Sequence, residues 1–265
     1  MTKLYAEGSY ALAQKLELCG EDLGITCTHC GGHRLVSQRC DRRWCPVCSY
    51  YIASARVDKY RAAAERFVWP LFVTLTVRNT LDVEGLTTLK KQWGKFRHRK
   101  LIRSQVRSGI VGFEITNKGN GWHPHIHALM DCRWLALHTP EIRRGDPPEE
   151  KTRKAKSAAM ELENLWSEIT EQESTSIKIR RGNAGALVEV LKYSVKGSDL
   201  LDSRDSIGPL IELMDGMRLM TTFGAIRKEM QDQQPEEDKP KAKCPDCGEC
   251  GCLMTDKAIS RMTNL

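Results

Sequence analysis

Residues 121–131 read GWHPHIHALMD, a short apolar stretch that holds three of the seven histidines of the chain. Its apolar residues lack helical periodicity, so we expect a strand from about Pro124 to Met130. Successive strand side chains point to opposite faces, which places His123, His125 and His127 on one face and the apolar residues between them on the other. Neighbouring imidazoles on a rigid strand suit a divalent metal, and a face of hydrogen-bonded histidines is the alternative.

A carboxylate is expected beside these histidines. IVGFEIT, residues 110–116, is a second predicted strand, and the NKGNG cluster at residues 117–121 predicts a hairpin turn between the two strands. In such a hairpin Glu114 reaches the level of His125 or His127. One carboxylate and two imidazoles form a three-ligand cation site with open positions for phosphate oxygens and water, whereas a surface charge is the alternative for Glu114.

The other predicted elements are ordinary in composition. A strand is expected for LFVTLTV at 71–77 and another for SIKIR at 176–180. Helices are predicted over 53–67, 87–107 and 150–170, and a further helix opens near residue 183 or 185. The helix over 87–107 is basic, so it either lies along DNA or presents a solvated face.

Composition narrows the class of protein. The chain has 265 residues, a net charge of +7 and a pI of about 8.8, which suit an anionic partner. No apolar run approaches the ~20 residues that span a bilayer, and the first residues lack the apolar core of a signal peptide. The eleven cysteines mostly stand in CxxC spacings, which indicate metal binding in a reducing cytosol, so we expect a cytoplasmic protein without a membrane partner.

Two CxxC pairs near the N-terminus predict a structural zinc site. Fourteen residues separate the pairs, and the four expected ligands are Cys27, Cys30, Cys45 and Cys48. Further candidate ligands are Cys40, His29 and His33. This segment has few large apolar residues, so the metal would supply much of its folding energy. Nearby arginines (Arg39, Arg42, Arg43 and Arg56) either contact phosphates or form a solvated basic face.

The C-terminal region has a different composition. QDQQPEEDKPKAK at residues 231–243 predicts a flexible linker. The cluster CPDCGECGC follows and places four cysteines within nine residues: Cys244, Cys247, Cys250 and Cys252. It can hold a second zinc, and a disordered or partner-completed knuckle is the alternative.

A second stretch with candidate catalytic residues is LVEVLKYSVKGSD on the last predicted helix. Glu189, Tyr193 and Lys196 share one helix face because they are four and three residues apart. A tyrosine activated by a cation and a lysine can attack phosphorus, and a carboxylate one turn away can act as a general base. The triplet by itself is a weak signal.

Taken together, the three stretches 72–76, 123–129 and 189–196 resemble the HUH endonucleases, specifically the plasmid-type rolling-circle replication initiators (Rep). The likeness covers roughly residues 27–230, including CDRRWCPVC at 40–48 and MTTFGAIRKE at 220–229. It implies an α+β fold, in which an antiparallel sheet flanked by helices forms an HUH/RRM-like core. We expect a zinc-ribbon-like segment with its helix at 1–66, an endonuclease domain at 67–230, and a linker with a cysteine-rich tail at 231–265.

The resemblance also implies roles. His125 and His127 match the paired ligands of Mg²⁺ or Mn²⁺, and Glu114 stands where a third ligand is often found, with His123 as its competitor. Tyr193 matches the single nucleophile that forms a 5′-phosphotyrosine and frees a 3′-OH. Lys196 matches the lysine behind it, and Glu189 the glutamate that activates water to end replication.

The implied activity is nicking and rejoining of single-stranded origin DNA, including an origin hairpin, for a plasmid or phage in a bacterial or archaeal host. A host helicase and polymerase are the expected partners. Two other functions stay open: a transposase of the same superfamily, and a non-catalytic zinc-dependent DNA-binding regulator whose histidines are structural.

Overall fold

The computed structural model describes residues 10–117, 119–138, 145–172, 177–182, 184–191, 208–232, 244–248 and 253–255. The chain divides into two units, which are Met1–Asp41 with Asp232–Leu265, and Arg42–Gln231. Each unit has its own antiparallel sheet, and helices flank the sheet of the larger unit. The predicted α+β class is therefore confirmed.

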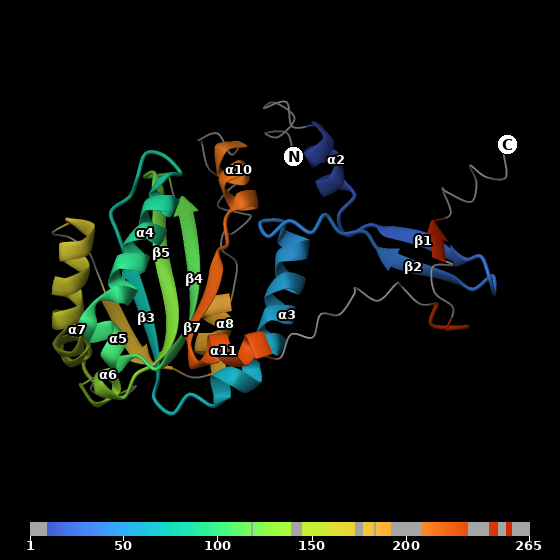
Figure 1. Cartoon of the computed structure of the whole chain (residues 1–265). Helices are drawn as coiled ribbons and strands as arrows, with labels where there is room; N and C mark the ends of the chain where they lie inside the picture. The colour runs from blue at the N-terminus through green and yellow to red at the C-terminus, as the bar shows by residue number, and fades with distance from the viewer. Residues whose placement is uncertain are drawn as a thin grey trace. The chain divides into compact units, whose positions relative to one another are not determined.

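The sheet of the larger unit has five antiparallel strands in the order β6-β3-β5-β4-β7. Figure 1 labels β3, β5, β4 and β7 of this sheet. The histidine-bearing β5 lies in the centre and pairs with β3 on one side and β4 on the other. The strand bounds are Pro70–Thr76 for β3, Ser108–Asn117 for β4, Trp122–Asp131 for β5, Ile177–Arg181 for β6 and Met220–Gly224 for β7. The hairpin predicted between the glutamate strand and the histidine strand is confirmed.

Helices cover both faces of this sheet (Figure 1). On one side α8 packs against β4 and β5, and α3 packs against α8. On the other side α4 packs against the same strands and against α7. The helix bounds are Pro46–Glu65 (α3), Gly85–His98 (α4), Lys100–Gln105 (α5), Arg133–His138 (α6), Pro148–Thr170 (α7), Ala184–Leu191 (α8), Gly208–Gly216 (α10) and Ala225–Asp232 (α11).

Successive side chains along each strand point to opposite faces of the sheet, so apolar residues pack on both of its sides. On the side of α4 and α7, the buried ring of Phe96 contacts the rings of Trp93 on α4 and Trp166 on α7. On the α8 side, Phe72, Ile110 and Leu129 form a cluster with apolar residues of α8. The histidine face of the sheet is therefore apolar at one end, where α8 lies, and polar farther along β5.

The single basic helix predicted over 87–107 is interrupted. Arg99 has an extended backbone (ψ 141°) between the last residue of α4 and the first of α5, and its guanidinium hydrogen-bonds the Glu168 carboxylate at 2.6 Å. The predicted helix over 53–67 begins earlier than expected, because Pro46 is a favourable first residue for α3.

The smaller unit is built from both ends of the chain. It holds α2 (Tyr10–Glu17) and a three-stranded sheet in the order β2-β1-β8, with bounds His33–Ser37, Asp22–Cys27 and Leu253–Thr255. The units divide at 41/42 and 231/232, whereas the expected boundaries were 66/67 and 230/231, so the second differs by one residue. The helix α3 belongs to the larger unit because it packs on α8, and part of the C-terminal tail joins the N-terminal strands through β8.

Most of the predicted linker at 231–243 lies outside the described residues, apart from its first two, which end α11. Among the helices described, none combines the length and the apolar character needed to cross a membrane.

Candidate functional site

Strand register brings a carboxylate and two imidazoles together. Glu114 of β4 pairs with His125 of β5, and His127 lies two residues along the same face. Glu114 Oε2 is 3.1 Å from Nε2 of His125 and 3.1 Å from Nε2 of His127. The three side chains are only 12–14% exposed. They can hold a divalent cation, since all three potential ligand atoms lie within 4.8 Å of one another.

Hydrogen bonds on the far side of each imidazole orient the rings. Nδ1 of His125 lies 3.2 Å from the backbone oxygen of His123, so a proton on Nδ1 is donated to that carbonyl. Nδ1 of His127 lies 3.1 Å from the Thr74 hydroxyl. Both contacts leave Nε2 turned toward Glu114, as expected for histidines that ligate metal through Nε2.

The electrostatics of Glu114 favour its ionised form. Burial alone raises the pKa of this carboxyl, but hydrogen bonds and positive charge from His125 and His127 lower the pKa to about 2. The carboxylate is therefore anionic at neutral pH and can contribute a negative charge to a bound cation.

His123, the competitor for third ligand, has a different neighbour. Its Nδ1 lies 2.8 Å from Oδ1 of Asn79, and its ring centroid is 5.4 Å from that of His125. On this sheet, the described group that could hold a metal ion contains Glu114, His125 and His127 but not His123. The hairpin register explains this outcome, because Glu114 faces His125 whereas His123 faces Thr116.

The C-terminal half of α8 lies over the histidine face. A Cβ added to Gly112 would come within 2.4 Å of the backbone oxygen of Val190. Gly112 pairs with His127 and shares a strand face with Glu114. Only a glycine allows α8 to approach the sheet so closely at this point, next to the ligands. The sequence offered a signal for this contact, the glycine inside IVGFEIT.

Of the three predicted catalytic residues, the structure describes one. Glu189 lies on α8 and is half-buried. Tyr193 and Lys196 lie outside the described residues. The structure therefore positions the helix that leads toward them and does not bear on their roles.

Two exposed cations stand beside the site, and sequence reasoning missed them. Lys178 and Arg180 of β6 pair with Thr74 and Phe72 of β3, so they share the histidine face. The Arg180 guanidinium lies 4.3 Å from the ring centroid of Phe72, and Phe72 stacks on His127 with centroids 5.3 Å apart. The alternation of SIKIR was the available signal, since its two cations stand two apart.

Further cations gather elsewhere in the larger unit. Arg43 donates a 2.6 Å hydrogen bond to the backbone oxygen of Met217, next to Arg218. Burial lowers the pKa of Lys90, and the charges of Arg218 and Arg43 lower it further. Burial and the charge of Arg43 likewise lower the pKa of Arg56. These cations repel one another, and a bound anion would relieve that repulsion.

The cysteines group differently from the prediction. In the smaller unit, four thiols come together: Cys27, Cys30, Cys244 and Cys247. The prediction grouped the first pair with Cys45 and Cys48, whereas pairing of β8 with β1 places the C-terminal pair beside the first pair. Cys45 and Cys48 are buried at the start of α3 in the larger unit. Cys250 and Cys252 lie outside the described residues.

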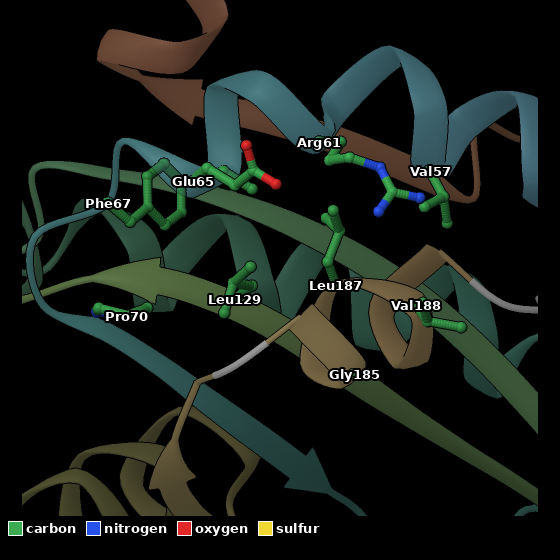
Figure 2. A pocket seen from close by; sticks show the side chains of 10 residues that line it. Val57, Arg61, Glu65, Phe67, Pro70, Leu129, Gly185, Leu187 and Val188 are labelled. Atoms are coloured by element: carbon green, nitrogen blue, oxygen red, sulfur yellow. The ribbon is translucent and has the colours of Figure 1, made fainter.

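A pocket of about 340 Å³ lies between α3 and α8 (Figure 2). Its walls are mostly apolar, and Arg61 and Glu65 of α3 are its two charged lining residues. None of Glu114, His125 and His127 lines it. Leu129, which lies on the histidine face of β5, forms part of its floor.

Three known proteins that are similar to the chain in sequence have names that refer to replication. Protein rep of Staphylococcus aureus is 28% identical to the chain over 179 residues, which cover 61% of this chain and 71% of that protein. Two proteins named replication protein, from Staphylococcus aureus and a Bacillus species, are each 24% identical over 170 residues, covering 60% of this chain and 71% of theirs. No protein family profile matches the chain, and no solved structure matches it.

Proposed function

We propose that the chain is a rolling-circle replication initiator of the HUH type, which nicks and rejoins single-stranded origin DNA through a 5′-phosphotyrosine. The observation that carries this proposal is the Glu114–His125–His127 group on a sheet face that α8 covers. The similarity to proteins named for replication supports the same reading.

The three ligands would hold Mg²⁺ or Mn²⁺, whose charge polarises the phosphate that is cut. Glu114 supplies the anionic ligand, and the hydrogen bonds to His125 and His127 keep both Nε2 atoms directed at the ion. A centre with three protein ligands leaves coordination positions for phosphate oxygens, as a nuclease requires.

Tyr193 is the proposed nucleophile. Its oxygen would bond to phosphorus while the P–O3′ bond breaks, so that the phenolic proton is lost and a 3′-OH is released. Lys196 would stabilise the phenolate, and Glu189 would later take a proton from water or from a hydroxyl to end the reaction. The approach of Val190 to Gly112 supports these assignments. Tyr193 follows Val190 by three residues, and three residues span at most about 11 Å.

The cations described above would bind the DNA backbone. Lys178 and Arg180 are exposed on the face that carries the ligands, so a strand held at the metal can pass over β6. The cluster around Arg43 and Arg218 offers a second contact for phosphates. Electrostatic attraction of this kind is independent of base sequence.

The proposal also covers the cellular location of the chain, its partners and its zinc binding. The chain would act in the cytoplasm on a plasmid or phage replicon, with a host helicase and polymerase extending the released 3′-OH. The N-terminal cysteines would bind zinc, and for Cys45 and Cys48 this stays a prediction.

The decisive experiment uses labelled circular single-stranded DNA of the host replicon with Mn²⁺. The unmodified chain should leave a 5′-linked peptide that mass spectrometry maps to Tyr193, and Tyr193→Phe should give neither nick nor adduct. Tyr50→Phe is the matched control, because Tyr50 is 63% exposed on α3 and lies far along the chain from the site.

Two outcomes would overturn the proposal. An adduct that persists in Tyr193→Phe would show that another residue is the nucleophile. A wild-type chain that binds the DNA with Mn²⁺ but never cuts it would leave a DNA-binding regulator as the function.

A further inference from the structure

The smaller unit contains two matching cysteine turns. In the first, the backbone N–H of Gly31 bonds the oxygen of Cys27 at 2.8 Å, and in the second that of Gly248 bonds the oxygen of Cys244 at 2.7 Å. Both glycines have φ +74°. Each turn is therefore a C-x-x-C-G knuckle, in which glycine adopts the left-handed conformation that other residues disfavour.

The two knuckles face each other. The Sγ atoms of Cys27 and Cys247 are 3.8 Å apart, and those of Cys30 and Cys244 are also 3.8 Å apart. A disulfide would bring sulfurs to about 2.0 Å, so these pairs are not bridged. Four thiolates at about 2.3 Å from a tetrahedral zinc are separated by about 3.8 Å, which is the spacing observed.

Contacts around the knuckles hold the second one in place. Arg34 of β2 forms an ion pair with Asp246, which lies between the two cysteines of the second knuckle. A Cβ on Gly32 would lie 2.6 Å from Oδ2 of Asp246, so the backbone after the first knuckle is closely approached by the second. Cys27 also pairs with Leu253 in the β1–β8 ladder.

The described part of the smaller unit has few buried apolar side chains to support this arrangement. Among the residues of this unit whose side-chain burial is described, only Ala13, Cys27 and Cys244 are buried and apolar, and two of these belong to the four-cysteine group. Every residue of β2 is exposed, including Leu35 at 65%. Without a hydrophobic core, a sheet of this size needs a crosslink or a metal to be stable.

We propose that Cys27, Cys30, Cys244 and Cys247 form one tetrathiolate Zn²⁺ site, and that zinc closes the smaller unit by joining the two ends of the chain. The ligands from the two ends are separated by more than 200 residues, with the larger unit lying between them in the sequence. The N-terminal ribbon is thus incomplete until the C-terminal knuckle has been made.

The test compares two double variants of the full chain. Purified protein is analysed for zinc by elemental mass spectrometry, and Cys244→Ser with Cys247→Ser should lose one equivalent relative to wild type. The matched control, Cys250→Ser with Cys252→Ser, alters the same tail and should lose none. Equal zinc in the first variant and wild type would overturn the proposal, and so would loss in the control.

A second measurement does not depend on whether the variants fold. Wild-type protein is alkylated with and without a strong chelator, and the modified cysteines are mapped by mass spectrometry. The four proposed ligands should be protected together and become reactive together. Protection of the first knuckle while Cys244 and Cys247 react freely would contradict the site, as would iron in place of zinc. Neither readout involves DNA, so the result is independent of the proposed nuclease.

Discussion

The Glu114–His125–His127 group and the four-cysteine group of the smaller unit differ in what supports them. Glu114, His125 and His127 stand on a sheet that large buried side chains hold from both sides. The four-cysteine group belongs to the smaller unit, in which few of the described side chains are both buried and apolar. In the first region, buried side chains hold the sheet that carries the candidate ligands, whereas in the second region we propose that a bound metal stabilises the fold. Metal binding would therefore serve the proposed reaction in one place and stability in the other.

Metal removal should show the largest contrast between the regions. On treatment with a strong chelator, we expect amides of β1 and β2 to exchange hydrogen at nearly unprotected rates, because little apolar burial remains to hold them. Amides of β3, β4 and β5 should keep their protection. Hydrogen-exchange mass spectrometry measures both in one sample. Equal loss in both sheets would show that the larger sheet also depends on metal.

Replacing both His125 and His127 should abolish DNA nicking and leave the fold intact. In His125→Gln with His127→Gln, amide donors remain near the Glu114 carboxylate, but the imidazole ligands are gone. We expect nicking with Mn²⁺ to fall by at least about a hundredfold, the scale of losing one strong electrostatic stabiliser. The thermal unfolding midpoint should change by only a few degrees.

A nicking rate that survives this double change would separate the activity from the histidine site. Binding of the uncut DNA at low salt serves as the control, because the cations of β6 are untouched and should still attract the backbone.

Thr74→Val tests the orientation of His127. The substitution removes the hydroxyl that lies 3.1 Å from Nδ1 while keeping nearly the same shape. We expect Mn²⁺ affinity to fall about 10- to 100-fold, as for other partners behind metal ligands. Thr74→Ser keeps the hydroxyl and should restore most of the affinity. Calorimetric titration of Mn²⁺ measures both, and equal losses in the two variants would indicate a packing effect instead.

Gly112→Ala should have the smallest effect of these changes. Its new Cβ would lie 2.4 Å from the Val190 oxygen, so α8 must shift away from the sheet. We expect the free energy of unfolding to fall by about 1–3 kcal/mol. The control is Gly94→Ala on α4, where a Cβ meets nothing within 4 Å and the helix should gain about 1 kcal/mol. Denaturant titration measures both variants, and an unchanged Gly112→Ala would mean that α8 does not rest tightly on β4.

Much of the sheet that carries Glu114, His125 and His127 follows from local patterns. Alternation in HPHIH sets which side chains share a face, and a short turn sets the register that brings Glu114 opposite His125. Both depend on residues close together in the sequence, so they can be predicted without the fold. The orientation of His127 by Thr74 and the cations of β6 depend on pairing between distant strands, which the sequence does not specify.

The cysteines show most clearly what could not be predicted from the sequence alone. The sequence by itself identified the CxxC pairs as candidate metal ligands, because thiolates at this spacing suit one ion. Only the tertiary structure decided that Cys27 and Cys30 join Cys244 and Cys247, since spacing along the chain favoured Cys45 and Cys48. The choice rests on the pairing of β8 with β1, a contact across more than 200 residues. Loop-closure cost grows so slowly with length that a near pair has little advantage over a far one that gains strand hydrogen bonds.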